Sequence, residues 1–164
     1  MRALSFAAAA FFALALFLGG GSQVSAESGI NWMALDAAKA QAKKTGKPVL
    51  VSFYTTWCGY CKKMDRETFK NPAVIKAVND NFLPVMLDGD EEAALTRTYA
   101  VRGYPTIVFT DEAGKSLLAS PGYRPPEHFL ALLKYVHSGM YKKMTYEKFY
   151  GDGFARRYAF PAAK

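Results

Sequence analysis

The sequence predicts an α/β domain in which a mixed β-sheet is covered by helices on both faces. Four short, mostly apolar segments have the length and composition of strands; they span residues 49–54, 83–87, 106–110 and 116–120. Helical patterns separate the first three segments, and a turn that ends at Gly114 joins the last two. Crossover helices favour parallel pairing, whereas a tight turn favours antiparallel pairing, so we expect the sheet to be mixed.

Helices are expected before, between and after these strands. The helical patterns span residues 32–44, the stretch from the two cysteines to residue 69, and residues 72–79, 90–99 and 126–137. Asn31 is placed to cap the first of them and Asn71 the third, because an asparagine side chain accepts hydrogen bonds from the free amides of a first turn. The acidic residues at 90–92 would lie in the first turn of the fourth helix, where negative charge is favourable.

Two cysteines, Cys58 and Cys61, follow the first strand and open the second helix. They are the only two in the chain, so no structural disulfide framework can form and the pair is available for exchange. Cys58 would lie near the helix N-terminus, where free amides and the helix dipole stabilise a thiolate. We therefore expect Cys58 to be the attacking nucleophile. Cys61 lies one turn further into the helix and is the expected resolving thiol.

Residues 1–26 have the features of a secretory signal peptide. Arg2 precedes an apolar run over residues 6–18, and small residues precede a predicted cleavage site after Ala26. An uncleaved membrane anchor is the alternative, but the run is shorter than the roughly 20 residues that span a bilayer. A bacterial leader of this form predicts the periplasm, where disulfides persist.

Positive charge is concentrated in the C-terminal part of the chain. Residues 27–139, the predicted domain, carry 14 basic and 12 acidic residues, a net charge of +2, whereas residues 140–164 carry 6 and 2, a net charge of +4. The domain therefore lacks the basic footprint of a nucleic-acid-binding protein. A structural zinc site needs four ligands, and His128 and His137 are poorly spaced to complete one with the cysteines. We expect no metal and no organic cofactor beyond a redox-active disulfide.

The segment Trp57-Cys58-Gly59-Tyr60-Cys61, followed later by Gly103-Tyr104-Pro105-Thr106, resembles the thioredoxin superfamily. The resemblance covers about residues 30–137. It implies a thioredoxin fold, with a central mixed sheet of about four to five strands flanked by helices on both faces and followed by a C-terminal extension.

The same resemblance implies the roles of several residues around the cysteines. Pro105 would have a cis peptide bond and pack beside the disulfide, and the backbone of Tyr104 would pair with a bound client strand. Trp57, Gly59 and Tyr60 complete the expected substrate-binding surface.

One departure from thioredoxin concerns the proton of the resolving thiol. Thioredoxin has a buried aspartate six residues before its first cysteine, where this chain has Ser52, which cannot accept a proton at neutral pH. Asp65, four residues after Cys61 and so on the same helix face, is the candidate substitute. In having an acidic residue at this position, the chain resembles the C-terminal domain of the electron carrier DsbD. The alternative is a solvated acid paired with Lys62 or Lys63.

The residues in and after the motif bear on the direction of electron flow. The residues between the cysteines, Gly59-Tyr60, are similar to those of the disulfide isomerase DsbC. That isomerase needs an additional dimerisation domain, and residues 27–57 are too few to form one. The segment from Cys61 to Phe69 instead resembles small secreted thioredoxin-like proteins of the SoxW type. These resemblances imply a monomeric periplasmic reductant of client disulfides, itself re-reduced by a membrane electron donor of the DsbD or CcdA kind. The alternatives are a disulfide oxidase or isomerase, or a non-catalytic binding module.

The extension over residues 140–164 alternates aromatic and basic side chains. We favour a short helix around residues 145–150 whose aromatic side chains cover the domain, because such spacing usually reflects packing. The alternative is a docking arm for an anionic membrane surface or an acidic partner.

Overall fold

The computed structural model describes residues 29–161. The signal peptide predicted over residues 1–26 lies outside this range and stays a prediction. Within residues 29–161, no helix combines the length and the apolar character that crossing a membrane requires.

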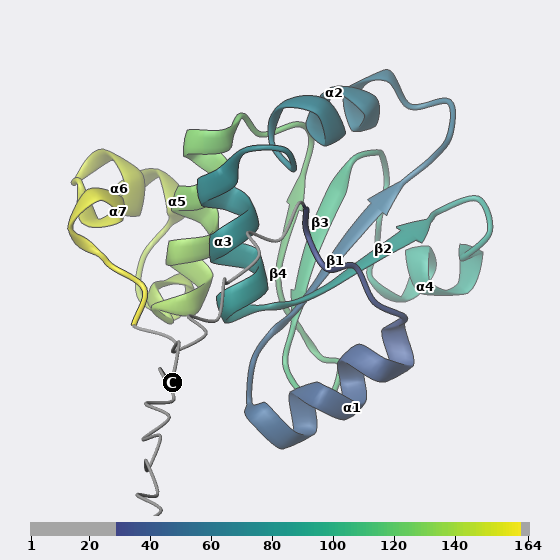
Figure 1. Cartoon of the computed structure of the whole chain (residues 1–164), viewed down its shortest axis with the longest axis horizontal. Coiled ribbons are helices and arrows are strands. Elements are labelled where there is room, and N and C mark those ends of the chain that lie inside the picture. The colour runs from purple at the N-terminus through teal and green to yellow at the C-terminus, as the bar shows by residue number, and fades with distance from the viewer. Residues whose placement is uncertain (1–28, 162–164) are drawn as a thin grey trace, which may run out of the picture.

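A mixed sheet of four strands forms the centre of the molecule, in the order β2-β1-β3-β4 (Figure 1). Strand β1 (Val49–Tyr54) pairs in parallel with β2 (Leu83–Asp88) and antiparallel with β3 (Thr106–Thr110). Strand β4 (Ser116–Pro121) completes the sheet antiparallel to β3. The predicted mixed sheet is therefore confirmed.

Helices cover both faces of this sheet, as the sequence predicts. On one face, Val51 and Phe53 pack against α1 (Leu35–Thr45), with Leu95 of α4 (Ala93–Thr98) at the margin of the same cluster. Side chains alternate along a strand, so the residues between them point to the other face.

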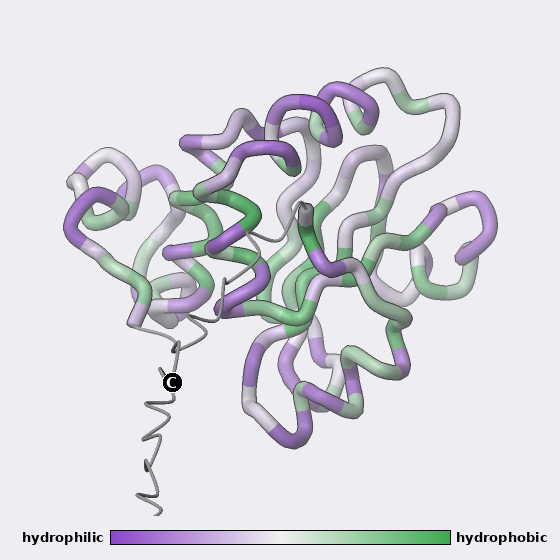
Figure 2. The backbone as a smooth tube through the Cα atoms, in the orientation of Figure 1, coloured by the Kyte–Doolittle hydropathy of each residue, from purple (hydrophilic) through white to green (hydrophobic). Residues whose placement is uncertain are grey.

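That other face carries the larger apolar cluster. Leu50 packs there with α3 (Pro72–Asn81) and α5 (Pro126–His137), which lie side by side in Figure 1. Figure 2 shows hydrophobic stretches in the central strands and in α3 and α5, whereas α2 (Gly59–Glu67) is mostly hydrophilic. Its inward contribution to this cluster is Met64, which is 1% exposed.

Helix α1 begins at Leu35, three residues later than predicted, and Asn31 does not cap it. The Asn31 amide instead donates to the Asn79 side-chain oxygen of α3 (3.0 Å), and the Met33 amide donates to the Pro84 carbonyl of β2 (3.0 Å). Tertiary partners for these amides therefore replace a local cap. The prediction for α3 is confirmed, because the Asn71 side chain accepts hydrogen bonds from two amides of its first turn, at 3.0 and 3.2 Å.

The C-terminal extension packs against α5. It contains the 3₁₀ turn η1 (Met140–Lys142) and the helices α6 (Tyr146–Gly151) and α7 (Phe154–Arg157). Phe149 of α6 is 1% exposed and belongs to the larger cluster. The Tyr135 hydroxyl of α5 donates to the Met144 carbonyl, and the Tyr146 hydroxyl donates to the His128 carbonyl (2.9 Å). The extension therefore shares the core of the domain.

Phe149→Ala should lower the free energy of unfolding by about 3–5 kcal/mol, because it removes a fully buried aromatic side chain and leaves a cavity. Tyr141→Ala, at a partly exposed position of the same extension, is the control and should cost less. Denaturant titration of both variants measures the difference. A loss of less than about 1 kcal/mol for Phe149→Ala would contradict the shared core.

Candidate active site

Strand β1 carries the chain to the two cysteines at one end of the sheet. Its residues Val51 and Phe53 are fully buried, so the C-terminal end of β1 is held in the core. The Cys58 amide then donates to the Thr55 carbonyl (3.2 Å), closing a turn over residues 55–58. Helix α2 starts directly after this turn, with Cys58 at its N-cap position. Cys58 and Cys61 form a disulfide, and their Cα atoms are 5.3 Å apart.

The Cys58 sulfur caps helix α2. It accepts a hydrogen bond from the Cys61 amide at 3.0 Å, as the side-chain oxygen of a serine or aspartate does at other helix starts. After reduction, this amide and the positive end of the helix dipole would stabilise negative charge on the Cys58 sulfur. The arrangement therefore favours Cys58, rather than Cys61, as the thiolate.

Exposure alone does not distinguish the two cysteines. Cys58 is 5% exposed and Cys61 is 3% exposed, so in the disulfide form both are covered. The neighbouring aromatic residues differ greatly from them, because Trp57 is 67% and Tyr60 is 66% exposed. A partner that approaches Cys58 therefore meets these two rings first.

The Tyr104-Pro105 peptide bond is cis, and Pro105 is buried. The Pro105 carbonyl accepts a hydrogen bond from the Gly122 amide (2.7 Å), which ties this loop to the end of β4. The backbone of Tyr104 makes no hydrogen bond with any other residue of the range 29–161. Pairing of this backbone with a client strand stays a prediction.

The loop between β2 and α4 seats two of these aromatic residues. The Trp57 indole donates to the Asp90 carboxylate at 2.9 Å, and the Trp57 and Tyr104 rings meet edge to face with centroids 6.0 Å apart. Tyr104 lies so close to Gly89 that an added Cβ there would be 2.1 Å from its hydroxyl oxygen. Partial burial, and then Asp90 and Asp88, raise the pKa of Tyr104, so its hydroxyl stays neutral.

No pattern in the sequence indicates the role of this loop. The acidic residues 90–92 are expected in the first turn of a helix, but α4 begins only at Ala93. Asp90 instead bonds Trp57, which is 33 positions away in the chain. No local pattern reveals such a contact.

A second pair of aromatic residues lies on the α2 side of the site. The rings of Tyr60 and Tyr123 are 6.5 Å apart. The Tyr123 hydroxyl donates to the Glu67 carboxylate (2.5 Å), and Lys63 lies 4.6 Å from the centre of the Tyr123 ring. The bond to Glu67 raises the pKa of Tyr123. Tyr123 was not predicted, because it reaches α2 from 56 positions beyond Glu67.

Asp65, the candidate proton acceptor, is exposed on α2, whereas Cys61 on the same helix is buried. Enough protein surrounds the carboxyl group to raise its pKa by desolvation, against the lowering effect of Lys70 and Arg66. Asp65 forms no ion pair within residues 29–161, and Lys63 lies beside Glu67 instead (4.0 Å). The role of Asp65 as an acceptor stays a prediction.

The two histidines lie apart from the disulfide and from each other. His128 stacks on Tyr150, with ring centroids 4.5 Å apart. His137 Nδ1 is 2.6 Å from the Tyr158 hydroxyl, and burial, followed by Lys47, lowers the pKa of His137. Within residues 29–161, no three histidine, cysteine or acidic residues are grouped to hold a metal.

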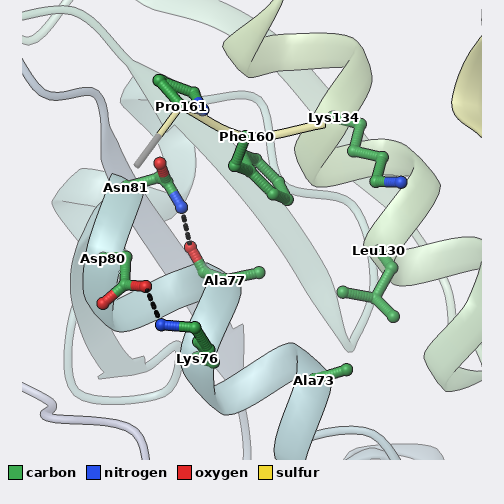
Figure 3. A pocket seen from close by; sticks show the side chains of 9 residues that line it. All are labelled: Ala73, Lys76, Ala77, Asp80, Asn81, Leu130, Lys134, Phe160 and Pro161. Carbon is green, nitrogen blue, oxygen red and sulfur yellow. Dashed lines mark hydrogen bonds and ion pairs between the residues drawn. The ribbon is translucent and has the colours of Figure 1, made fainter. Parts of the chain in front are cut away.

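A pocket of about 410 Å³ lies away from the cysteine motif. Helices α3 and α5 and the end of the extension line it, and Phe160 points into the space between the helices (Figure 3). Lys76 and Asp80 form an ion pair at its edge (2.7 Å). None of its lining residues belongs to α2 or to the loops that surround the disulfide.

A disulfide that caps the helix after β1, together with a buried cis-proline directly before the neighbouring strand β3, is the arrangement of a thiol–disulfide exchange site. The model of the thioredoxin-like domain family matches residues 35–137. The chain is 36% identical over 104 residues to the thiol:disulfide interchange protein DsbD of Ralstonia nicotianae, covering 61% of this chain and 17% of that protein.

Two further similarities agree with this match. The chain is 36% identical over 108 residues to protein disulfide-isomerase of Gallus gallus, covering 65% of this chain and 21% of that protein. A thioredoxin structure from Thermus thermophilus has a TM-score of 0.59 and 31% identity, covering 65% of this chain and 86% of that one.

The chain therefore belongs to the thioredoxin-like family and carries a thiol–disulfide oxidoreductase site. It spans only about a fifth of the length of these two curated relatives.

Gly89→Ala should slow the exchange reaction with a protein disulfide by roughly tenfold to a hundredfold, because the new Cβ displaces Tyr104 and so the expected seat of the client. Gly103→Ala, next to Tyr104 in the loop between α4 and β3, is the control, since its Cβ would meet nothing within 4 Å. Comparing kcat/KM for insulin disulfides measures the effect. Equal values for the two variants would show that the position of Tyr104 is unimportant.

Proposed function

We propose that this protein is an exported thiol:disulfide oxidoreductase that reduces disulfides of client proteins with its Cys58–Cys61 dithiol. The observation that carries the proposal is the Cys58 sulfur at the start of α2, where the Cys61 amide donates to it (3.0 Å). This position supplies a stabilised thiolate beside a free stretch of backbone at Tyr104.

The reaction takes two displacement steps. The Cys58 thiolate attacks one sulfur of the client disulfide, so that the client S–S bond breaks, a mixed disulfide forms and the other client sulfur leaves and is protonated. Cys61 then loses its proton and attacks the Cys58 sulfur. The mixed disulfide breaks, the Cys58–Cys61 disulfide forms, and the client is released with both sulfurs reduced. Two electrons pass from the protein to the client. Asp65 is the proposed acceptor of the Cys61 proton.

The client is proposed to bind as an extended strand along Tyr104 and Pro105. The unpaired backbone of Tyr104 supports this binding mode, because strand addition uses main-chain hydrogen bonds. Trp57 and Tyr60 flank the cysteines and offer apolar contact area. At Gly59 an added Cβ would meet nothing within 4 Å, so no other residue of the described range covers this position next to Cys58.

The proposed location is the periplasm, where the protein would act as a monomer. The leader predicted over residues 1–26 supports export, and the similarity to DsbD supports a reducing role. An exported reductant needs electrons, and we propose a membrane electron donor of the DsbD or CcdA kind. No cofactor is needed, because thiol–disulfide exchange transfers the electrons directly between sulfurs.

A second candidate is an oxidase or isomerase of client disulfides, which the similarity to protein disulfide-isomerase favours. Both candidates use the same site and differ in the reduction potential of the Cys58–Cys61 pair. If the protein is a reductant, the reduction potential of the Cys58–Cys61 pair should be nearer to the roughly −270 mV of thioredoxin than to the roughly −120 mV of DsbA. Equilibration with glutathione measures it, and a value near the oxidising end would favour the second candidate.

Reduced Cys61→Ser protein should accumulate a mixed disulfide with a disulfide-bonded peptide, because Cys58 attacks but no thiol resolves the product. Mass spectrometry locates the adduct, which we expect on Cys58. Cys58→Ser is the control and should form at most about a tenth as much adduct on Cys61. Equal trapping by the two variants would contradict the assigned roles, and no trapping by either would contradict exchange at this site.

A further inference from the structure

The Thr55 hydroxyl stands out among the buried polar groups. Thr55 is 1% exposed, and within residues 29–161 its Oγ1 is the single fully buried side-chain nitrogen or oxygen without a hydrogen-bond partner. Two other buried threonines have partners, since the Thr68 hydroxyl donates to the Arg124 carbonyl (2.6 Å) and that of Thr106 to the Gly103 carbonyl (2.8 Å). A buried polar group left unpaired is costly, so it calls for an explanation.

The backbone places Thr55 next to the disulfide. Its carbonyl accepts the Cys58 amide (3.2 Å) in the turn over residues 55–58, and the ends of such a turn lie within about 7 Å. The Cα atoms of Cys58 and Cys61 are 5.3 Å apart, and both cysteines are buried, as Thr55 is. Thr55 therefore adjoins the redox turn through its backbone, and its unpaired hydroxyl is covered, as the two cysteines are.

The disulfide form offers this hydroxyl little to bind. A disulfide has no S–H group, and its sulfurs are weak acceptors. Reduction by two electrons and two protons breaks the S–S bond and leaves two separate sulfurs. The Cys58 sulfur already has the Cys61 amide as its donor. The Cys61 sulfur accepts no hydrogen bond from residues 29–161 and becomes a group that both donates and accepts.

We propose that Thr55 is a positioning residue whose hydroxyl hydrogen-bonds the Cys61 sulfur in the dithiol state. A hydroxyl accepts from the Cys61 thiol and donates to the Cys61 thiolate, so it serves this sulfur before and after loss of the proton. It does not take the proton itself. Because the bond exists only after reduction, it stabilises the dithiol relative to the disulfide and raises the reduction potential.

The inference rests on the Cys58–Cys61 pair cycling between disulfide and dithiol, as the proposed function requires, and not on the direction of electron flow. If neither glutathione nor the stronger reductant dithiothreitol reduces the wild-type pair, the exchange function fails. If the wild-type pair equilibrates normally but the Thr55 variants share its potential, only the role of Thr55 fails.

Thr55→Val replaces the hydroxyl by a methyl group of similar size. We expect the equilibrium constant for reduction by glutathione to fall about tenfold, which corresponds to a potential lower by about 30 mV for a two-electron couple. Thr55→Ser keeps the hydroxyl and should stay within about threefold of the wild type. Thr55→Ala also lacks the hydroxyl without adding a methyl group, so it gives a second measurement if the valine variant folds poorly.

Unfolding of the oxidised and reduced forms by denaturant closes the thermodynamic cycle. The valine variant should destabilise the reduced form more than the oxidised form, by the same factor as the change in the glutathione equilibrium. Thr68→Val is the control, because its hydroxyl is already bonded in the disulfide form; it should destabilise both forms alike and leave the potential unchanged. Equal effects of Thr55→Val on both forms, with an unchanged potential, would show that the hydroxyl makes no bond specific to the dithiol form and would overturn the proposal.

Discussion

The hydrogen bond from the Cys61 amide to the Cys58 sulfur is the interaction on which the site depends. It forms because Cys58 occupies the N-cap position of α2, one residue before the helix begins. The buried strand β1 and the turn over residues 55–58 set that position. A helix start leaves amides without internal partners, so any group at the N-cap meets donors and a positive potential. The reactivity of Cys58 thus follows from the position of one helix end.

The rest of the site is assembled from loops that are distant in sequence. The loop after β2 seats Trp57 and Tyr104 through Asp90 and Gly89, and the segment after β4 brings Tyr123 onto Glu67. Through Asp90 and Tyr123, these contacts give the exposed rings of Trp57 and Tyr60 defined positions at the margin of a covered disulfide. The N-terminus of α2 therefore determines the reactivity of the Cys58 sulfur, whereas the loops determine which groups surround it.

The sequence predicted the parts of this structure that local patterns encode. Apolar runs located the four strands, the Asn71-Pro72 pair located the start of α3, and the cysteine spacing located the redox pair. The start of α1 was predicted wrongly, because Asn31 finds its partner on α3 and not in its own helix. The acidic residues at 90–92 are expected in the first turn of a helix, but they lie in the loop before α4. Helical spacing places Asp65 on the same face of α2 as Cys61, but it does not predict burial, and Asp65 is exposed whereas Cys61 is buried. Gly89, Tyr123 and Thr55 carried no signal, since their importance comes from long-range contacts or from a missing one.

The nucleophile assignment can be tested directly by alkylating the reduced protein with iodoacetamide at mildly acidic pH. An ordinary thiol, with a pKa of about 8.5, is then almost fully protonated and reacts slowly, whereas a stabilised thiolate reacts. Peptide mass spectrometry identifies the modified residue. The structure predicts that Cys58 is labelled first and faster than glutathione. Preferential labelling of Cys61, or labelling of Cys58 no faster than of glutathione, would contradict a helix-stabilised thiolate at Cys58.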